Sequence, residues 1–350
     1  MNLRIPSLDG IRAISFLIVF IAHAGLEAVV PGGFGVTVFF FLSGYLITTL
    51  LRVEYQQHGH INLKHFWLRR ALRILPPFYV VLLGATLLTL CVDFGVGVSG
   101  SALAGQLLHV TNYWIILHGY AGQPLGTGVY WSLAVEEHFY LLFPWLYIGM
   151  QKLRLSGRGQ ALLLWGLCLL ILLWRCVLVL KLHVGTDRTY MASDTRVDSI
   201  LFGCALAVWH NPVLDPAPAR HERIWKWLLL PLALALLGGC LVYRGDAFRE
   251  TLRYSLQGLA LTVIFICAIR YEGWAAFRWL NHRVLVFVGT LSYALYLVHY
   301  TVIFAAAKAM PRAGAVAQGL VAFGASLLLA WLSYVYLEKP CARLRRKLSD

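Results

Sequence analysis

The sequence has few charged residues for its length. Asp, Glu, Lys and Arg make up 13% of its 350 residues, whereas 59% are hydrophobic. Soluble proteins typically carry about 25% charged residues, so this composition excludes a domain that faces water on all sides. It also excludes a disordered chain, which combines low hydrophobicity with high net charge. The composition therefore predicts a membrane protein.

Cysteine is also scarce. The seven cysteines occupy positions 91, 168, 176, 204, 240, 267 and 341, mostly inside apolar runs. They form no C-x-x-C pair and have no histidine partner at a metal-binding spacing, which excludes the usual zinc motifs. We expect neither a disulfide framework nor a bound metal.

Apolar runs of about 20 residues recur along the chain, and each is long enough to cross the roughly 30 Å hydrocarbon core of a bilayer as a helix. No small-residue cleavage site follows the first run, so we expect that run to be retained as a span. The predicted fold class is an all-α polytopic transmembrane bundle of about ten spans, forming a single domain over residues 1–350 without a soluble extracytoplasmic domain. The predicted spans are residues 11–29, 34–51, 75–97, 128–149, 160–182, 196–210, 226–243, 252–270, 284–307 and 315–337.

The formal net charge of +14 follows from the membrane class, because cytoplasmic loops of membrane proteins are enriched in Lys and Arg. Nucleic acid is not needed to explain it. Most of the 30 Lys and Arg residues, Arg4 and Arg220 among them, fall on the cytoplasmic side if both termini are cytoplasmic. We therefore place both termini, including a basic tail at 338–350, in the cytoplasm. Residues 61–74 alternate basic with apolar side chains, which favours a helix along the membrane surface.

Several ionisable residues lie inside predicted spans, where each costs a few kcal/mol and so requires a partner, a cavity or a function. Arg12 and His23 in the first span are 11 residues apart, so on a helix they share one face. Arg12 is alternatively an interfacial anchor whose charged end reaches the headgroups. His23 is alternatively a packing residue, although an imidazole among Phe20 and Ile21 is unusual.

The fourth predicted span carries a polar stripe. Ser132, Glu136 and Tyr140 follow each other at intervals of four residues, and Glu137 lies on an adjacent face. Two consecutive carboxylates inside a membrane favour a functional role. The alternative is a structural salt bridge, for which the candidate partners are Arg12, Arg175 and Arg196.

The ninth predicted span has a second polar face, formed by Ser292, Tyr296 and His299. The alternative to a functional role is an interhelical hydrogen bond, which membrane bundles often use.

Between the fifth and sixth predicted spans, Arg196 lies between Asp194 and Asp198. This grouping predicts a self-neutralised cluster at a helix end. Gly44 and Gly203 are small enough to allow close helix packing, and we assign them no chemistry.

Six motifs lie in order between Leu8 and about Pro340. They are 8-LDGIRAISFLIVFIAHAG-25, 39-FFFLSGYLI-47, 67-WLRRALRILPPFY-79, 131-WSLAVEEHFYLLFPW-145, 196-RVDSILFGCALA-207 and 292-SYALYLVH-299. Together they resemble the integral-membrane acyltransferase-3 family. The resemblance implies an enzyme of the bacterial inner membrane that moves an acyl group, most often acetyl, from cytoplasmic acyl-CoA to a sugar hydroxyl. The implied acceptors are lipopolysaccharide, exopolysaccharide, peptidoglycan and lipid-linked glycans.

Acyl transfer needs a base for the hydroxyl proton and positive charge near the developing oxyanion. We expect His23 to be the base or a transient acyl carrier, and Glu136 or Glu137 to orient its ring. Two groups of residues are candidates for binding acyl-CoA or the acceptor. The basic group is Arg12, Arg69, Arg70 and Arg73; the second group is Trp131, Tyr140, Arg196, Asp198, Tyr296 and His299.

Some expectations have alternatives. The basic residues, expected to grip the CoA phosphates, would also suit anionic lipid headgroups. His138 stands where the family commonly has Gln, and we expect no C-terminal esterase-like domain. We therefore expect it to complete the transfer alone or with a polysaccharide assembly partner. The alternative function is a secondary transporter that exports an acylated or lipid-linked sugar, which would also carry buried Arg, His and Glu residues.

Overall fold

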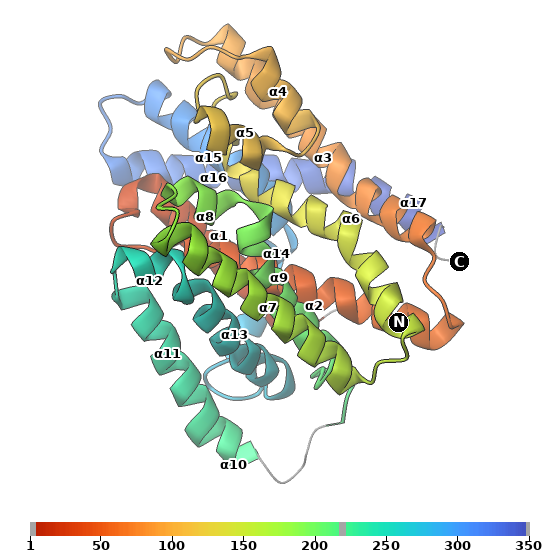
Figure 1. The fold of residues 1–350 in the computed structure, drawn as a ribbon. Coiled ribbons are helices and arrows are strands. Elements are labelled where there is room, and N and C mark those ends of the chain that lie inside the picture. Colours follow the sequence, from red (N-terminus) through yellow and green to blue (C-terminus); the bar gives the residue numbers. More distant parts are fainter. Residues whose placement is uncertain (1–4, 217–221, 348–350) are drawn as a thin grey trace. The chain divides into compact units, whose positions relative to one another are not determined.

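The computed structural model describes residues 5–216 and 222–347. These residues form helices joined by turns and loops, with no β-strand in either range (Figure 1). The all-α prediction is therefore confirmed for the described chain. Arg4, Arg220 and the last three residues of the predicted basic tail lie outside the described residues.

The chain separates into two compact units, each made of segments that are distant in the sequence. The first unit consists of Met1–Ser15, Val36–Ile61 and Leu142–Val286, and the second of Phe16–Gly35, Asn62–Leu141 and Phe287–Asp350. Four helices contribute residues to both units: α1 (Pro6–Ile21), α2 (Gly32–His58), α6 (Trp131–Lys152) and α14 (Arg283–Thr290).

In the first unit, α7 and α9 run side by side, and α9 also packs against α13 (Figure 1). The helical segments that belong to this unit alone are α7 (Gly157–Leu180), α8 (Thr186–Met191), α9 (Ser193–Val208), α10 (Glu222–Ile224), η3 (Trp225–Leu229), α11 (Leu230–Val242), α12 (Asp246–Glu250), α13 (Leu252–Arg270) and η4 (Arg278–Asn281).

Two glycines bring α2 and α9 into close contact within the first unit. A Cβ atom on Gly203 would lie 2.0 Å from the carbonyl oxygen of Phe41. One on Gly44 would lie 2.0 Å from the carbonyl oxygen of Ile200. Any larger residue would force the two backbones apart, so the close packing predicted at these glycines is confirmed.

In the second unit, α15 and α16 run side by side, and α3 packs against both α15 and α17 (Figure 1). The helical segments that belong to this unit alone are η1 (Ala22–Leu26), α3 (Leu63–Cys91), α4 (Gly100–Leu107), α5 (Thr111–His118), η2 (Thr127–Tyr130), α15 (Ser292–Ala309), α16 (Ala315–Ser333), η5 (Tyr334–Glu338) and α17 (Lys339–Lys347).

The basic segment 61–74 is not a separate surface helix. It forms the first part of α3, which begins after the N-cap Asn62 and continues through Pro76 and Pro77 to Cys91. The prediction of a helix that ends before the third span was therefore wrong. Prolines remove backbone donors from a helix, but neighbouring helices in membrane bundles make them tolerable. Tyr293 of α15 donates to the carbonyl of Ile74 (2.8 Å), which links α3 to α15 just before the two prolines.

Seven helices in the described chain are long and apolar enough to cross a membrane, or up to eight if α14 and α15 form one broken span. These two helices are bent by 74° relative to each other, so the predicted span 284–307 contains a break. The predicted span 196–210 corresponds to α9, whose 16 residues fall short of the roughly 17–25 that a crossing needs. The polar α6 is also not among the seven.

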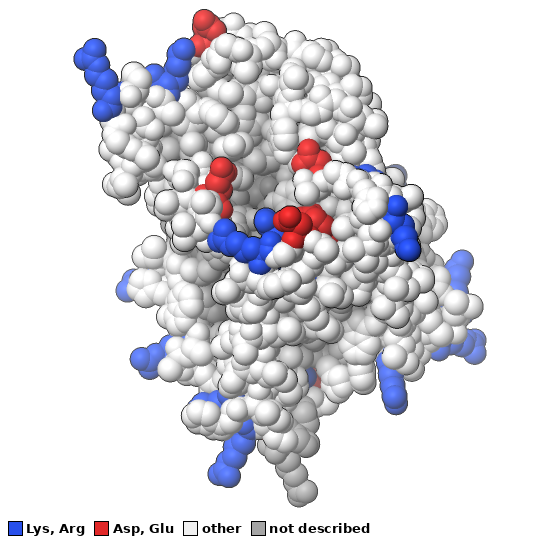
Figure 2. Space-filling view, turned by 60° about the vertical axis from the view of Figure 1, so that its left-hand side comes forward, with Lys and Arg blue, Asp and Glu red and all other residues white. Residues whose placement is uncertain are grey.

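The exposed surface is largely apolar, as a lipid-facing protein requires. α7 exposes Leu162, Leu170 and Leu173, and α11 exposes Leu232 and Leu234. Lys, Arg, Asp and Glu side chains cover only a small part of the face shown in Figure 2. The low charge content of the sequence is therefore visible as a largely uncharged exterior on this face.

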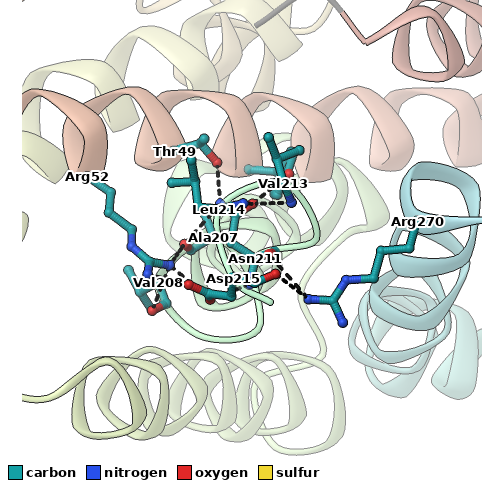
Figure 3. A network of polar contacts seen from close by, with 10 residues as sticks. Thr49, Arg52, Ala207, Val208, Asn211, Val213, Leu214, Asp215 and Arg270 are labelled. Atoms are coloured by element: carbon teal, nitrogen blue, oxygen red, sulfur yellow. Dashed lines mark hydrogen bonds and ion pairs between the residues drawn. The ribbon is translucent and has the colours of Figure 1, made fainter. Parts of the chain in front are cut away.

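A polar network in the first unit fastens the loop after α9 (Figure 3). The side chain of buried Asn211 accepts hydrogen bonds from Val213 N, Leu214 N and the Tyr45 hydroxyl, and donates to Thr49 Oγ1 and the Ala207 carbonyl. Two arginines complete the network. Arg52 of α2 donates to both carboxylate oxygens of Asp215, and Arg270 of α13 donates to the Asp215 carbonyl.

We expect Asp215 to make the folded protein sensitive to acid. Burial raises the pKa of its carboxyl group, but the hydrogen bond and charge of Arg52 outweigh that effect and hold the pKa below its usual value. A lowered folded-state pKa stabilises the fold above the unfolded-state pKa of about 3.9. This stabilisation is lost as the pH falls towards the folded-state pKa.

The measurement is the free energy of unfolding of the wild type and Asp215→Asn between pH 3 and pH 7 in detergent. The difference between them should be constant above about pH 5 and should shrink below about pH 4. Asp187→Asn, at an exposed position of α8, is the control. A difference that does not change with pH would show that the Arg52 contact does not depend on the Asp215 charge.

Candidate active site

His23 lies where the first helix changes its winding. α1 continues directly into the π-helical turn η1, which contains His23. Gly25, in the same turn, has a φ of 104°, a left-handed value that favours glycine. Ala24 and Gly25 both depart from helical φ/ψ values, so the chain is kinked directly after His23. His23 is half-buried, so its side chain is partly accessible.

His23 pairs with His299 of α15 within the second unit. Nδ1 of His23 lies 2.9 Å from Nε2 of His299, and the ring planes are inclined by only 10°. Nδ1 of His299 lies 2.7 Å from the carbonyl oxygen of Tyr296. Within residues 5–216 and 222–347, nothing forms a hydrogen bond with Nε2 of His23. That nitrogen is the one position of the pair that remains available for chemistry.

Aromatic rings enclose the inner member of the pair. Phe16 meets the His299 ring edge to face, with centroids 5.7 Å apart, and Phe20 lies 6.4 Å from it. His299 is fully buried. Tyr300 stacks on His23 at 4.5 Å. Water therefore approaches the pair from the His23 side.

Tyr296 connects this pair to α6. Its hydroxyl lies 2.7 Å from the hydroxyl of Ser132 and donates to the Val129 carbonyl at 3.1 Å. The polar face predicted for the ninth span thus brings Tyr296 and His299 to partners on other segments. For Tyr296, this is the interhelical hydrogen bond that we considered as the alternative.

Glu136 and Tyr140 form a second group about 6 Å further along α6, one helical turn from Ser132. The Tyr140 hydroxyl donates to Glu136 (3.3 Å), as their spacing of four residues predicts. The guanidinium of Arg70 lies 6.0 Å from the Tyr140 ring and interacts electrostatically with Glu137. Arg70 is thus close enough to Glu137 to offset part of its charge.

The partner of His23 differs from the predicted one. We expected Glu136 or Glu137 to orient the ring, but His299 occupies Nδ1, the nitrogen that an orienting carboxylate would contact. His23 and His299 are 276 residues apart in the chain, so no local spacing reveals the pair. The only signal was the position of His299 on the polar face of its span.

Asp198 belongs to the protein core. Both Asp198 and Arg175 have fully buried side chains, and they form an ion pair at 2.7 Å in the first unit. Asp198 also accepts hydrogen bonds from Ser255 and from its neighbour Ser199 N. Protein groups thus take up both carboxylate oxygens of Asp198, and its contact with substrate stays a prediction. Arg175, one of the salt-bridge partners that we considered for the carboxylates of the fourth span, has Asp198 as its partner.

Arg196 is enclosed as well. Its guanidinium lies 3.9 Å from the Tyr254 ring centroid and donates to Thr37 Oγ1 at 3.1 Å. Its neighbours Asp194 and Asp198 pair with Arg188 and Arg175 instead. The two aspartates of the predicted self-neutralised cluster thus pair with arginines outside it. Arg196 is fully buried, and its contact with substrate stays a prediction.

The other predicted binding residues differ in their contacts and burial. Arg12 forms an ion pair with Asp9, one turn away in α1, at 3.3 Å. Arg73 interacts electrostatically with Glu338. Arg69 is half-buried, and Trp131 is buried. No group of three or more His, Cys, Asp or Glu residues within the described chain is arranged to hold a metal ion.

Sequence reasoning missed the aromatic surroundings of the pair. Phe16 and Phe20 were counted as ordinary span residues, and Tyr300 was not considered. Phe20 and Phe16 precede His23 by about one and two helical turns, respectively. Tyr300 follows His299 directly. The available signal was that these aromatic residues are close in the sequence to His23 and His299, which were predicted site residues.

The chain is a helical membrane protein with a partly accessible imidazole pair, and comparison with known proteins identifies its family. A family model described as an acyltransferase domain matches residues 5–335. The chain therefore belongs to the acyltransferase-3 family, as its motifs indicated. No solved structure matches it.

Curated relatives are similar over 96% of the chain. Peptidoglycan O-acetyltransferase OatA of Listeria monocytogenes is 29% identical, and the chain covers 55% of it. The putative peptidoglycan O-acetyltransferase YrhL of Bacillus subtilis is 32% identical, with 54% covered. A putative O-acetyltransferase of Staphylococcus aureus strain COL is 30% identical, with 57% covered. The chain thus spans about half the length of these relatives.

Proposed function

We propose that this protein is a membrane O-acetyltransferase that moves an acetyl group from acetyl-CoA to a hydroxyl of a cell-envelope glycan. The observation that carries this proposal is the accessible Nε2 of His23, held by the buried His299 through its other nitrogen. Such an imidazole suits a general base for a sugar hydroxyl. The family match and the names of the relatives support the same reaction class.

In the proposed reaction, Nε2 of His23 takes the proton from the acceptor hydroxyl as its oxygen attacks the thioester carbonyl carbon. A C–O bond forms, the C–S bond breaks, and the departing thiolate takes the proton from Nε2. The products are the acetyl ester and free CoA.

The proposed setting is the bacterial cytoplasmic membrane, with ten spans and both chain ends in the cytoplasm. The one-sided distribution of Lys and Arg supports this orientation. In that orientation, Arg12 and the start of α3 lie near the cytoplasmic donor, and His23 lies nearer the outer face. The acceptor glycan is reached from outside.

The direct test uses the purified full chain in lipid nanodiscs, with acetyl-CoA labelled in the acetyl group and a peptidoglycan fragment or an exopolysaccharide as acceptor. The proposal predicts labelled glycan and free CoA in equal amounts. A transporter would move a lipid-linked glycan across vesicles without consuming acetyl-CoA. That result would contradict the proposal.

We expect Arg69 and Arg70 to hold the phosphates of CoA. Arg69→Gln/Arg70→Gln should weaken CoA binding roughly 10- to 100-fold, because hydrogen bonds to charged groups are worth about 1.5–3 kcal/mol. The measurement is calorimetric titration of the purified protein with CoA. Arg154→Gln/Arg158→Gln changes two exposed arginines on the same predicted side and is the control. Unchanged affinity in the first variant would assign Arg69 and Arg70 to lipid headgroups instead.

A further inference from the structure

We propose that His299 is a positioning residue that fixes the tautomer of His23, so that the lone pair needed for catalysis lies on Nε2. The inference rests on the proposed function, because it concerns the same base. It goes further by assigning to His299 a role other than substrate binding.

The carbonyl of Tyr296 determines which nitrogen of His299 carries a hydrogen. A carbonyl oxygen only accepts hydrogen bonds, so Nδ1 of His299, 2.7 Å away, carries a hydrogen. In the neutral ring, Nε2 of His299 is then an acceptor. The 2.9 Å contact between the two rings therefore needs its hydrogen from Nδ1 of His23. With Nδ1 protonated, neutral His23 has its lone pair on Nε2.

The other tautomer of His23 would disable the site. With the hydrogen on Nε2, two lone pairs would face each other across the 2.9 Å contact, and the accessible nitrogen could not take a proton. The tautomer of a catalytic histidine is generally set by the hydrogen bond that its other nitrogen makes. Here that partner is a second histidine instead of a carboxylate.

The surroundings hold His299 rigid enough to do this. Its ring is fully buried and meets Phe16 edge to face. The carbonyl that fixes its Nδ1 belongs to Tyr296, whose hydroxyl is bound to Ser132 and Val129. Tyr300 stacks on His23 at 4.5 Å and restricts rotation of that ring. The direction of the Nε2 lone pair is thus set from α15 and α6.

The same geometry determines where the proton goes. The chain of hydrogen bonds ends at the Tyr296 carbonyl, which cannot take up a proton at neutral pH. No proton can leave the site through His299. The proton that His23 takes from the hydroxyl must therefore return through Nε2 to the leaving thiolate.

The test compares two substitutions of His299 in steady-state acetyl transfer. His299→Gln can place an amide oxygen near the position of Nε2, where it accepts the hydrogen of His23 Nδ1. His299→Leu removes the acceptor. We expect His299→Leu to lower kcat on the order of 10²-fold, as a misplaced catalytic group does, with little change in KM. His299→Gln should restore most of kcat.

His118 provides the matched control, since its Nδ1 also bonds to a backbone carbonyl, that of Trp114, but its side chain is exposed. His118→Leu and His118→Gln should leave kcat unchanged. If the wild type is active and His299→Leu has the same kcat, the role of His299 is refuted, but the proposed function is not. A wild type that transfers no acetyl group would instead refute the proposed function.

A measurement on the wild type keeps the test decisive if His299→Leu does not fold. Nitrogen-15 spectra of histidine-labelled protein distinguish a protonated from an unprotonated ring nitrogen, and His23→Ala identifies the His23 signals by their loss. We expect Nδ1 of His23 to be protonated and Nε2 to be unprotonated near neutral pH. The reverse pattern would overturn the inference.

Discussion

Acetyl transfer should be lost when His23 is replaced by alanine. General base catalysis contributes about 10²–10⁴-fold to a rate, and His23 is the member of the histidine pair whose second nitrogen is available. We therefore expect the transfer rate of His23→Ala to fall roughly 10³-fold. The measurement is the amount of labelled acetyl group on the glycan per mole of purified protein. Unchanged transfer would refute the assignment of His23.

The control for this substitution is His60→Ala. His60 is exposed, and its Nδ1 lies near the carbonyl of His58, two residues away. Its loss should affect neither expression nor transfer. The same assay separates two roles of His23. If the wild-type protein retains label in the absence of acceptor and His23→Ala does not, His23 carries the acyl group covalently. If the wild-type protein stays unlabelled, the result supports His23 as a general base.

The histidine pair shows which parts of the site the sequence can predict. The position of His23 in an apolar span and the common face of Tyr296 and His299 follow from composition and helical periodicity. Their pairing does not, because it depends on how helices that are distant in the sequence pack. A carboxylate was the expected partner of His23, and only the fold shows that an imidazole takes this place.

The fold shows a similar limit. Apolar runs locate helices well, because each must satisfy its own backbone in a membrane, and every predicted span overlaps a helix. The helix ends were less predictable. The basic segment before Pro76 and Pro77 looked like a surface helix, but α3 runs through both prolines. Proline tolerance and the bend between α14 and α15 both depend on neighbouring helices.

Two aspartates on α9 should respond very differently to the same substitution. Asp194 and Asp198 lie one turn apart, and each forms an ion pair with an arginine. The side chains of Asp198 and Arg175 are fully buried, whereas that of Asp194 is 40% exposed. Sequence spacing does not distinguish these two sites. Burial does, because removing one partner of a buried pair leaves the other charge without compensation.

We expect Asp198→Ala to lower the free energy of unfolding by about 3–5 kcal/mol. Without Asp198, the guanidinium of Arg175 keeps only its contacts with the Thr195 and Thr251 carbonyls and the Ser255 hydroxyl, and none of these groups carries a negative charge. Asp194→Ala should lower the free energy of unfolding by about 1 kcal/mol or less, as is typical of exposed ion pairs. The measurement is reversible unfolding in mixed micelles with increasing SDS.

A double substitution separates charge from packing. Arg175→Leu/Asp198→Leu removes both charges and should recover part of the stability lost in Asp198→Ala, because apolar replacement of a buried ion pair is often neutral. Equal losses for Asp194→Ala and Asp198→Ala would show that burial does not govern the strength of the pair. The double variant could also be less stable than Asp198→Ala. That result would show that α7, α9 and α13 are held together by the hydrogen bonds of Arg175 to the Thr195 and Thr251 carbonyls, and not by its neutralisation by Asp198.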